Sequence, residues 1–158
     1  MPDPVTRAGI GFDVHPLGSG RVLWLGGAEF PDHEGLAGHS DGDVVCHALA
    51  DALLGAAALG DVGVHFPDSD GSLLGITGLD LLARTVEILA RAGFSPTSCD
   101  LTVICDRPPI DPRREEIRAN LAAALGLGVD RVSVKATRPE GLGLRGEGIG
   151  CQAVAMIR

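Results

Sequence analysis

Apolar positions along the chain predict three helices and a set of short strands. Helical spacing of apolar residues runs over 41–56 and 78–93, and a third helix is expected at about 112–125. Alternating or β-rich runs predict strands at 6–15, 98–105, 131–137 and 150–157, together with a hairpin over 21–30 that turns at Gly26-Gly27. The segments 31–38 and 60–72 are expected to be loops.

This order of elements predicts an α+β fold with two layers, a mixed sheet of about four to five strands with helices packed on one face. The 158 residues are expected to form a single domain over 1–158. Aromatic residues make up only 3% and Tyr is absent, so the core must consist of Leu, Val, Ala and Ile. The apolar alternation of Val132, Val134 and residues 151–157 is expected on the sheet face opposite the helices, where further copies of the chain would cover it.

The first predicted helix carries a row of polar side chains opposite its apolar stripe. Ser40 and Asp43 have the spacing of a capping box, which predicts that the helix begins near Asp41. The apolar stripe comprises Val45, Leu49, Ala52, Leu53 and Ala56. Asp43, His47 and Asp51 follow at i, i+4 and i+8 on the other side. Such a row is either a solvated helix face or a histidine held by carboxylates while its other nitrogen binds a ligand.

A metal site is predicted where the first strand ends. Asp13 and His15 are two residues apart on that strand, so their side chains point to the same side of the sheet. Together with His47 they offer two imidazoles and one carboxylate, a set that suits zinc with an open fourth position for water or substrate. The fold must bring the three residues together, because they are far apart in the sequence.

Charge and cysteine content narrow the functional classes. The formal net charge of −8 argues against general nucleic-acid binding, which needs a basic face. The four cysteines form no CxxC pair, so they predict neither a zinc knuckle nor a disulfide framework and are expected to be reduced and largely buried. No apolar run approaches the roughly 20 residues of a membrane span, and the N-terminus lacks the features of a signal peptide. A cytoplasmic protein without membrane contacts is therefore expected.

Polar groups in and beside loops supply candidate ligands for an anion. The carboxylates of segment 60–72 serve either hydroxyl recognition or an ordinary polar turn. The Gly-rich loop that follows strand 131–137 carries Arg138, Glu140 and Arg145. A Gly-rich backbone with arginines can cradle phosphate, and Glu140 can hold a second, hard cation. His39 precedes the N-terminus of the first helix, where anions and phosphates bind.

Several segments resemble those of the 2-C-methyl-D-erythritol 2,4-cyclodiphosphate synthases of the non-mevalonate isoprenoid pathway: GFDVH, AGHSDGDVVCHALADALLGAAALGDVG, FPDSD, ICDRP, and VKAT followed by Glu140 and GEGI. The resemblance covers essentially the whole chain in order. Such enzymes convert 4-diphosphocytidyl-2-C-methyl-D-erythritol 2-phosphate to the 2,4-cyclodiphosphate by attack of its 2-phosphate on the β-phosphorus, with release of CMP. The resemblance implies a homotrimer with active sites at its three interfaces.

The resemblance also implies roles for individual residues. The metal ligands would be Asp13, His15 and His47 for zinc and Glu140 for a magnesium or manganese ion that bridges the α- and β-phosphates. His39 would contact the substrate phosphate and stabilise the transition state. Residues 61–63 and 66–70 would receive the methylerythritol part, and residues 105–111 with Thr137 the cytidine part. The full implied substrate-binding set is Asp13, Val14, His15, His39, Ser40, Asp61, Val62, Gly63, Phe66, Pro67, Asp68, Ser69, Asp70, Cys105, Asp106, Arg107, Pro108, Pro109, Ile110, Asp111, Thr137, Arg138, Pro139, Glu140, Leu144 and Arg145.

The chain departs from this family at three places. Arg138 stands where the family usually has Thr, and Pro109 replaces a common Lys. The loop GLRGEG is shorter than usual, with Leu144 in place of an aromatic residue and Arg145 as the retained arginine. We expect Arg138 to act as a catalytic phosphate ligand in place of the missing hydroxyl, with Arg145 as a candidate partner. The alternative is that Arg138 is solvated and only the backbone of this segment matters.

Two other functions remain open from the residues alone. A zinc-dependent phosphoesterase would attack phosphate with metal-bound hydroxide and needs a base beside an open water site. A non-enzymatic, metal-stabilised binding module would need a closed metal site. Structural zinc sites normally have four protein ligands, whereas three are identified in this chain, which disfavours the binding module.

Overall fold

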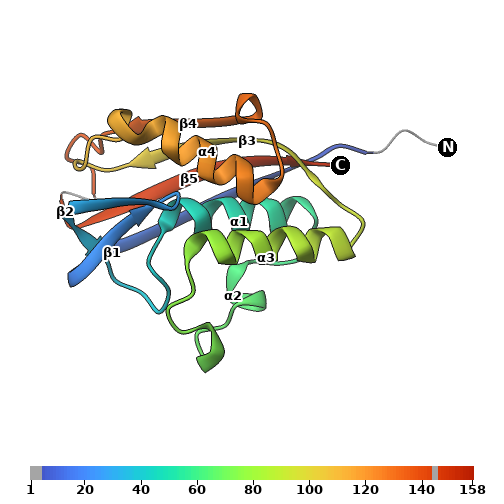
Figure 1. Cartoon of the computed structure of the whole chain (residues 1–158), viewed down its shortest axis with the longest axis horizontal. Helices are drawn as coiled ribbons and strands as arrows, with labels where there is room; N and C mark the ends of the chain where they lie inside the picture. Colours follow the sequence, from blue (N-terminus) through green and yellow to red (C-terminus); the bar gives the residue numbers. More distant parts are fainter. Residues whose placement is uncertain (1–4, 144–145) are drawn as a thin grey trace.

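A five-stranded mixed sheet forms the centre of the computed structural model, which describes residues 5–143 and 146–158 (Figure 1). The strands are β1 (Arg7–Leu25), β2 (Ala28–Leu36), β3 (Pro96–Ile104), β4 (Val132–Thr137) and β5 (Gly148–Ile157), in the spatial order β2-β1-β5-β3-β4. The β3–β4 pair is parallel, and the other neighbouring strands are antiparallel. The predicted mixed sheet of four to five strands is confirmed.

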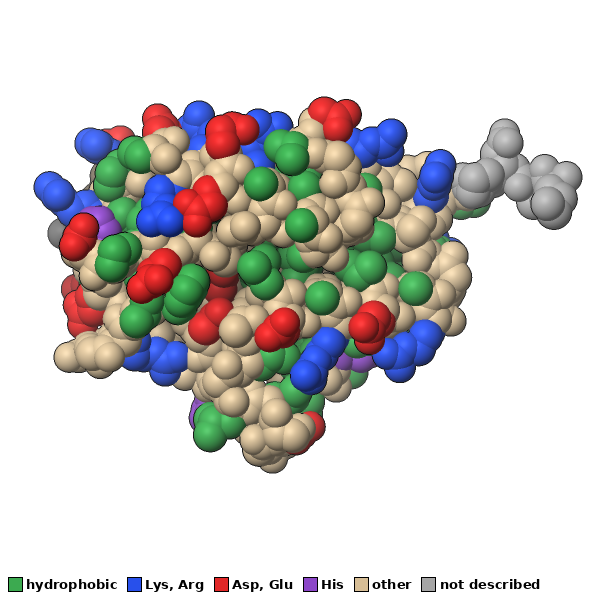
Figure 2. Space-filling model, viewed as in Figure 1, with side chains coloured by type: hydrophobic (Ala, Val, Ile, Leu, Met, Phe, Trp, Pro, Cys, Tyr) green, Lys and Arg blue, Asp and Glu red, His purple; other side chains and the backbone are tan. Residues whose placement is uncertain are grey.

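The helices gather on one face of this sheet and form the second layer (Figure 1). They are α1 (Val44–Ala56), α2 (Val62–His65), α3 (Gly78–Arg91) and α4 (Arg114–Leu125). Helix α1 packs on β1 and β5, while α3 packs on α1 and α4. Basic and acidic side chains are interspersed over the face shown in Figure 2. The α+β, two-layer prediction is therefore confirmed.

Two glycines of β1 allow the backbone of α1 to lie directly against the sheet. A Cβ atom at Gly9 would come within 2.0 Å of the carbonyl oxygen of Ala52, and one at Gly11 within 1.9 Å of that of Ala48. Any side chain at these positions would push the helix away, so glycine is needed for this close approach. As a result, α1 lies beside the strand that carries Asp13 and His15.

The two faces of the sheet differ in what covers them. The buried face includes Val132, Val134, Cys151, Ala153, Ala155 and Ile157, packed under the helices. The prediction that these residues lie on the open face is wrong, because β-alternation alone does not say which phase faces the helices. The open face instead carries Ile10, Phe12, Val14 and Val154, whose exposed fractions are 75%, 57%, 43% and 39%.

Several predicted boundaries shift in the structure. Strand β1 continues without a break from residue 7 to the Gly26-Gly27 turn, and β2 runs on to Leu36 through the segment that we expected to be a loop. Segment 60–72, also expected to be a loop, contains α2 and a short 3-10 turn, Gly71–Leu73. Hydrogen-bonded pairing between β1 and β2 extends both strands beyond their predicted ends. The composition of each segment alone does not predict this pairing.

The start of α1 differs from the predicted capping box. Asp43 is the N-cap, and its carboxylate accepts the backbone N–H groups of Val45 and Cys46. The same carboxylate accepts the N–H groups of Gly26 and Gly27, each at 2.8 Å. Asp43 is fully buried, so it ties the hairpin turn to the helix and does not belong to a solvated helix face.

Candidate active site

The residues Asp13, His15 and His47, which we call the metal cluster, meet where β1 passes the first turn of α1. The Oδ2 atom of Asp13 lies 3.1 Å from His15 Nε2 and 3.1 Å from His47 Nδ1. One potential ligand atom from each residue lies within 4.8 Å of the others. The fold thus brings together the three residues that the sequence predicted as a metal site.

The hydrogen bonds of His15 show that the metal cluster fits a cation. His15 Nδ1 lies 2.5 Å from the carbonyl oxygen of Ala37, and a carbonyl can only accept, so Nδ1 carries a proton. In a neutral ring Nε2 is then an acceptor, yet it faces the carboxylate oxygen of Asp13. A proton or a metal ion must lie between these two acceptors. Two imidazole nitrogens and one carboxylate oxygen are a donor set that zinc accepts.

The pKa values of Asp13 and His15 shift in opposite directions because the two side chains attract each other. Burial disfavours the Asp13 carboxylate, but its hydrogen bonds with His15 and His47 outweigh burial and hold the pKa of Asp13 well below its usual range. The hydrogen bond with Asp13 raises the pKa of His15, although burial acts in the opposite direction. Asp13 is therefore ionised at neutral pH, as a metal ligand must be.

The carboxylates one turn either side of His47 do not flank its ring as predicted. Asp43 is the buried helix cap, and the Oδ1 atom of Asp51 accepts the backbone N–H of Val62 at 2.8 Å. Burial raises the pKa of Asp51. His47 instead pairs with Asp13 through Nδ1, and its Nε2 lies 3.2 Å from Ser40 Oγ.

The metal cluster opens into a cavity of about 660 Å³, which we call the metal-side cavity. Its lining residues come from β1, the loop 38–40, helix α1, the stretch 61–76 and the start of α3. The side chain of His39 is 67% exposed and its Nε2 lies 3.9 Å from Asp68 Oδ2. The predicted residues that line this cavity are Asp13, His15, His39, Ser40, His47, Asp61, Val62, Gly63, Phe66, Pro67, Asp68 and Asp70.

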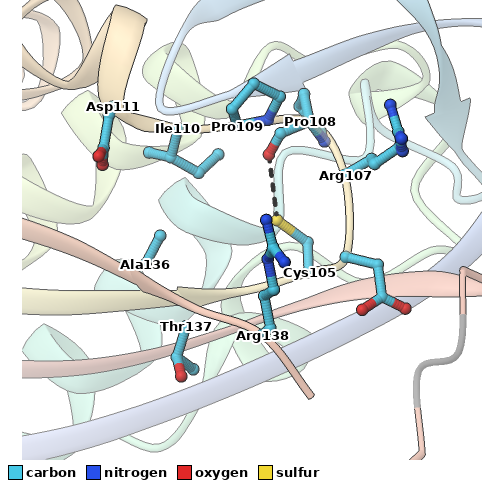
Figure 3. Close-up of a pocket in the computed structure, with 10 residues that line it drawn as sticks. Cys105, Arg107, Pro108, Pro109, Ile110, Asp111, Ala136, Thr137 and Arg138 are labelled. Carbon is cyan, nitrogen blue, oxygen red and sulfur yellow. Dashed lines mark hydrogen bonds between the residues drawn. The ribbon is translucent and has the colours of Figure 1, made fainter. Parts of the chain in front are cut away.

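A second cavity, of about 580 Å³, lies beyond the carboxyl ends of the parallel strands β3 and β4 (Figure 3). We call it the edge cavity. Its lining residues are Cys105, Asp106, Arg107, Pro108, Pro109, Ile110, Asp111, Ala136, Thr137 and Arg138. The backbone N–H of Cys105 donates to the carbonyl of Thr137 at 3.1 Å, which joins the two strand ends. Ligands commonly bind outside the carboxyl ends of parallel strands.

Arg138 extends over the edge cavity from the end of β4, on the side where Cys105 lies (Figure 3). The Cys105 thiol donates to the carbonyl of Pro108 at 3.5 Å and so fixes the first turn of the proline-rich loop. This arrangement places a guanidinium on the predicted cytidine side, whereas the metal cluster lines the other cavity. The two cavities share none of their lining residues.

Other predicted site residues lie outside both cavities. Val14 points to the open face of the sheet, and Ser69 is exposed between two lining carboxylates. Pro139 is buried and Glu140 is exposed just after β4, and neither lines the metal-side cavity or the edge cavity. Leu144 and Arg145 lie outside the described residues.

A model of the YgbB family matches residues 6–158 of the chain. The chain belongs to the YgbB family. A similar protein from Symbiobacterium thermophilum, named 2-C-methyl-D-erythritol 2,4-cyclodiphosphate synthase, is 52% identical over 151 residues, which cover 94% of this chain and 96% of that protein. A solved structure of a synthase with this name has a TM-score of 0.89 at 35% identity and covers 96% of this chain and 100% of its own. A second, described as the CDP-bound form, has the same TM-score at 34% identity, with the same coverage.

Membership of the YgbB family confirms the resemblance predicted from the motifs. The structure adds apolar cavity residues that the motifs did not single out, namely Leu73, Leu74, Ile76 and Leu81. Leu73, Leu74 and Ile76 follow within six residues of FPDSD, and this apolar stretch was the available signal for them. None of the helices in the described part of this YgbB chain combines the length and apolar character of a membrane-spanning helix.

Proposed function

We propose that the chain converts 4-diphosphocytidyl-2-C-methyl-D-erythritol 2-phosphate to 2-C-methyl-D-erythritol 2,4-cyclodiphosphate and CMP, in non-mevalonate isoprenoid biosynthesis. The observation that carries the proposal is the metal cluster on a polar cavity, in a chain that is 52% identical to a synthase of that name over nearly its whole length. The CDP-bound form of a similar structure supports a cytidine diphosphate ligand. The chain is thus a CMP-releasing lyase.

The reaction is an intramolecular phosphoryl transfer. An oxygen of the 2-phosphate forms a bond to the β-phosphorus, and the bond between the β-phosphorus and the oxygen that bridges to the α-phosphorus breaks. The electron pair of that bond leaves with CMP. No side-chain nucleophile is needed, so the protein contributes by positioning the two phosphates and by neutralising their charge.

We assign zinc to the metal cluster and magnesium or manganese to Glu140. When bound, zinc would act as a Lewis acid on a phosphate oxygen. The protein would orient the reactants: His15 and His47 are held by Ala37, Ser40 and Asp13, which fixes their rings. Glu140 is exposed after β4, where it can reach a diphosphate that extends from the edge cavity.

The substrate-binding residues follow from the two cavities. The methylerythritol part would lie against residues 61–63 and 66–70 of the metal-side cavity, with His39 and Ser40 on the phosphate. The cytidine part would lie in the edge cavity, with Arg138 as a ligand of the diphosphate. Arg138 lines the cavity with an extended, exposed side chain, and its place at the mouth of this cavity supports the phosphate role (Figure 3).

The active site would be shared between subunits of a homotrimer. The two cavities have no lining residue in common, and the open sheet face carries Ile10, Phe12 and Val14 in an apolar row. Exposed apolar rows of this kind are typical of protein interfaces. A trimer would bury this row and bring the edge cavity of one subunit to the metal-side cavity of the next.

Product analysis tests the proposed function. The protein is incubated with zinc, magnesium and the cytidyl substrate, and the products are followed by phosphorus NMR. Release of CMP together with a cyclic diphosphate supports the proposal. Release of a hydrolysed product would instead indicate a zinc-dependent phosphoesterase, and an unchanged substrate would indicate a binding module.

A further inference from the structure

Arg21 of β1 donates two hydrogen bonds to the loop that carries His39. The Nη1 atom of Arg21 donates to the carbonyl of Gly38 at 2.7 Å, and Nη2 donates to the carbonyl of Ser40. These two carbonyls belong to the residues on either side of His39. A single half-buried guanidinium therefore spans the peptide units around the side chain to which we assign the substrate phosphate.

Other backbone carbonyls of the loop 37–43 also accept hydrogen bonds from donors outside the loop. The carbonyl of Ala37 contacts the ring of His15, and that of His39 accepts the backbone N–H of Gly75 at 3.0 Å. Residues 37–43 lie in neither a helix nor a strand. Fixed hydrogen bonds to successive carbonyls thus replace secondary structure in this loop, and Arg21 supplies two of them.

The side chain of His39 makes few contacts, so its position depends mainly on the backbone to which it is attached. It is 67% exposed, and its nearest charged partner is Asp68 at 3.9 Å, which is itself 77% exposed. Exposed ion pairs of this kind contribute little to the position of a side chain. The direction in which His39 points is consequently set by the peptide units that Arg21 holds.

We propose that Arg21 is a positioning residue for the phosphate-contacting pair His39 and Ser40. This inference rests on the proposed function. Arg21 acts through the backbone of Gly38 and Ser40, and its effect is on the alignment of His39 with the phosphate during transfer. A displacement of about 1 Å in a group that contacts the reacting atoms can lower turnover about 100-fold.

The fork of the guanidinium is essential to this role. Two nitrogens of one planar group reach two carbonyls at once, whereas the ammonium of lysine is a single point with the same charge. Arg21→Lys therefore keeps the positive charge near the phosphates and loses the simultaneous contact with both carbonyls. This variant separates positioning from simple charge attraction.

The test compares Arg21→Ala, Arg21→Lys and wild-type protein in steady-state assays of CMP release. We expect kcat to fall about 10- to 100-fold in both variants while KM changes less, because the lost alignment matters most in the transition state. Zinc content should stay at the wild-type level. Millimolar guanidinium ion should restore part of the kcat of Arg21→Ala. Arg91→Ala, on the exposed pair between Arg91 and Glu87, is the matched control.

The outcomes are distinguishable. If wild-type protein releases no CMP, the proposed function fails, whatever the variants do. If wild type is active and Arg21→Lys matches its kcat, charge alone matters and the positioning role is wrong. A loss of activity that guanidinium does not restore and that accompanies a lower melting temperature would also overturn it, because Arg21 would then be a general structural residue.

Discussion

The metal-side cavity and the edge cavity differ in how their residues are fixed. Around the metal cluster, side chains from β1, α1 and the loop 37–43 form half-buried hydrogen bonds with one another, and glycines bring the backbones of β1 and α1 into contact. At the edge cavity, the lining residues follow the ends of β3 and β4 and are mostly exposed. Packing between β1 and α1 therefore fixes the residues of the metal-side cavity, whereas the ends of β3 and β4 determine the positions of the residues of the edge cavity.

This difference predicts different responses to substitution. Changes around the metal cluster act on a network whose members depend on one another, so they should alter metal binding, folding or both. Changes at the edge cavity should act on the bound substrate alone, because few of its side chains contact the core. The predictions below test this contrast, from the largest expected effect to the smallest.

His47→Ala should remove the bound metal and lower turnover by about 100-fold or more, because a metal ion at a phosphoryl group contributes several kcal/mol. The fold should survive, since α1 keeps the rest of its buried residues. Elemental analysis and circular dichroism check the two parts. Full zinc content in a folded His47→Ala protein would contradict the assignment of the metal cluster.

Asp43→Ala should lower the free energy of unfolding by roughly 3 kcal/mol, through loss of the helix cap and of partners for the buried N–H groups of Gly26 and Gly27. Urea unfolding at fixed protein concentration measures the change. Asp43→Asn, which keeps one acceptor oxygen, should lose less. Equal stability of both variants and wild type would show that the turn and the helix are not coupled through Asp43.

Arg138 tests the edge cavity. Guanidinium contacts with phosphate are worth about 1.5–3 kcal/mol, so Arg138→Ala should lower kcat/KM about 10- to 100-fold while the melting temperature stays constant. Arg138→Thr, which restores the residue usual in the family, should retain more activity than Arg138→Ala. Wild-type kinetic constants in both variants would mean that the arginine has no phosphate role.

Alkaline pH should weaken the folded state through the buried thiols. Burial raises the pKa of Cys99 to about 12 and that of Cys105 to about 11. Unfolded thiols ionise near pH 8.5, so the stabilisation is complete below that pH and is lost as pH rises toward the folded pKa values. Cys46 and Cys151 are buried too, and burial raises the pKa values of their thiols, so they act in the same direction. The chain has no Tyr and a single Lys, so few groups other than the thiols titrate in this range.

We expect the thiols of Cys99 and Cys105 each to account for roughly 1–2 kcal/mol of lost stability between pH 8 and 10. Urea unfolding across that range measures the slope, and Cys99→Ala should reduce it. A free energy of unfolding that stays flat from pH 8 to 10 would contradict the burial of these groups.

Local spacing placed two residues of the metal cluster, Asp13 and His15, on one side of a strand, whereas contacts between distant segments decided the rest of the site. Asp13 and His15 are two apart on one strand, so their common side followed from β-geometry alone. The cap at Asp43 could not be foreseen, because two of its partners, Gly26 and Gly27, lie 16 to 17 residues earlier. The common side of Asp13 and His15 depends on the geometry of one strand, whereas the cap at Asp43 depends on contacts between the helix and the hairpin turn.

The sheet also shows that local sequence patterns predict individual strands better than they predict contacts between elements. Strands β3, β4 and β5 were placed within two residues, whereas β1 and β2 extend well beyond the predicted strand and hairpin. The parallel or antiparallel pairing of the strands was left general. The alternation of Val132 and Val134 predicted a strand correctly but assigned its apolar side to the wrong face, because alternation alone does not say on which side of the sheet the preceding helix α4 packs. Arg21 gave no signal at all, since its two acceptors are backbone carbonyls.

Subunit complementation tests most directly the claim that one active site combines the two cavities from neighbouring chains. His47→Ala disables the metal side, and Ala136→Phe fills the edge cavity that Ala136 lines. Each variant alone should be nearly inactive. Trimers formed by refolding an equal mixture should recover about a quarter of the wild-type sites, because a site then needs an intact metal side and an intact edge cavity from different chains. A mixture as inactive as either variant alone, in trimers shown to contain both chains, would contradict the shared site.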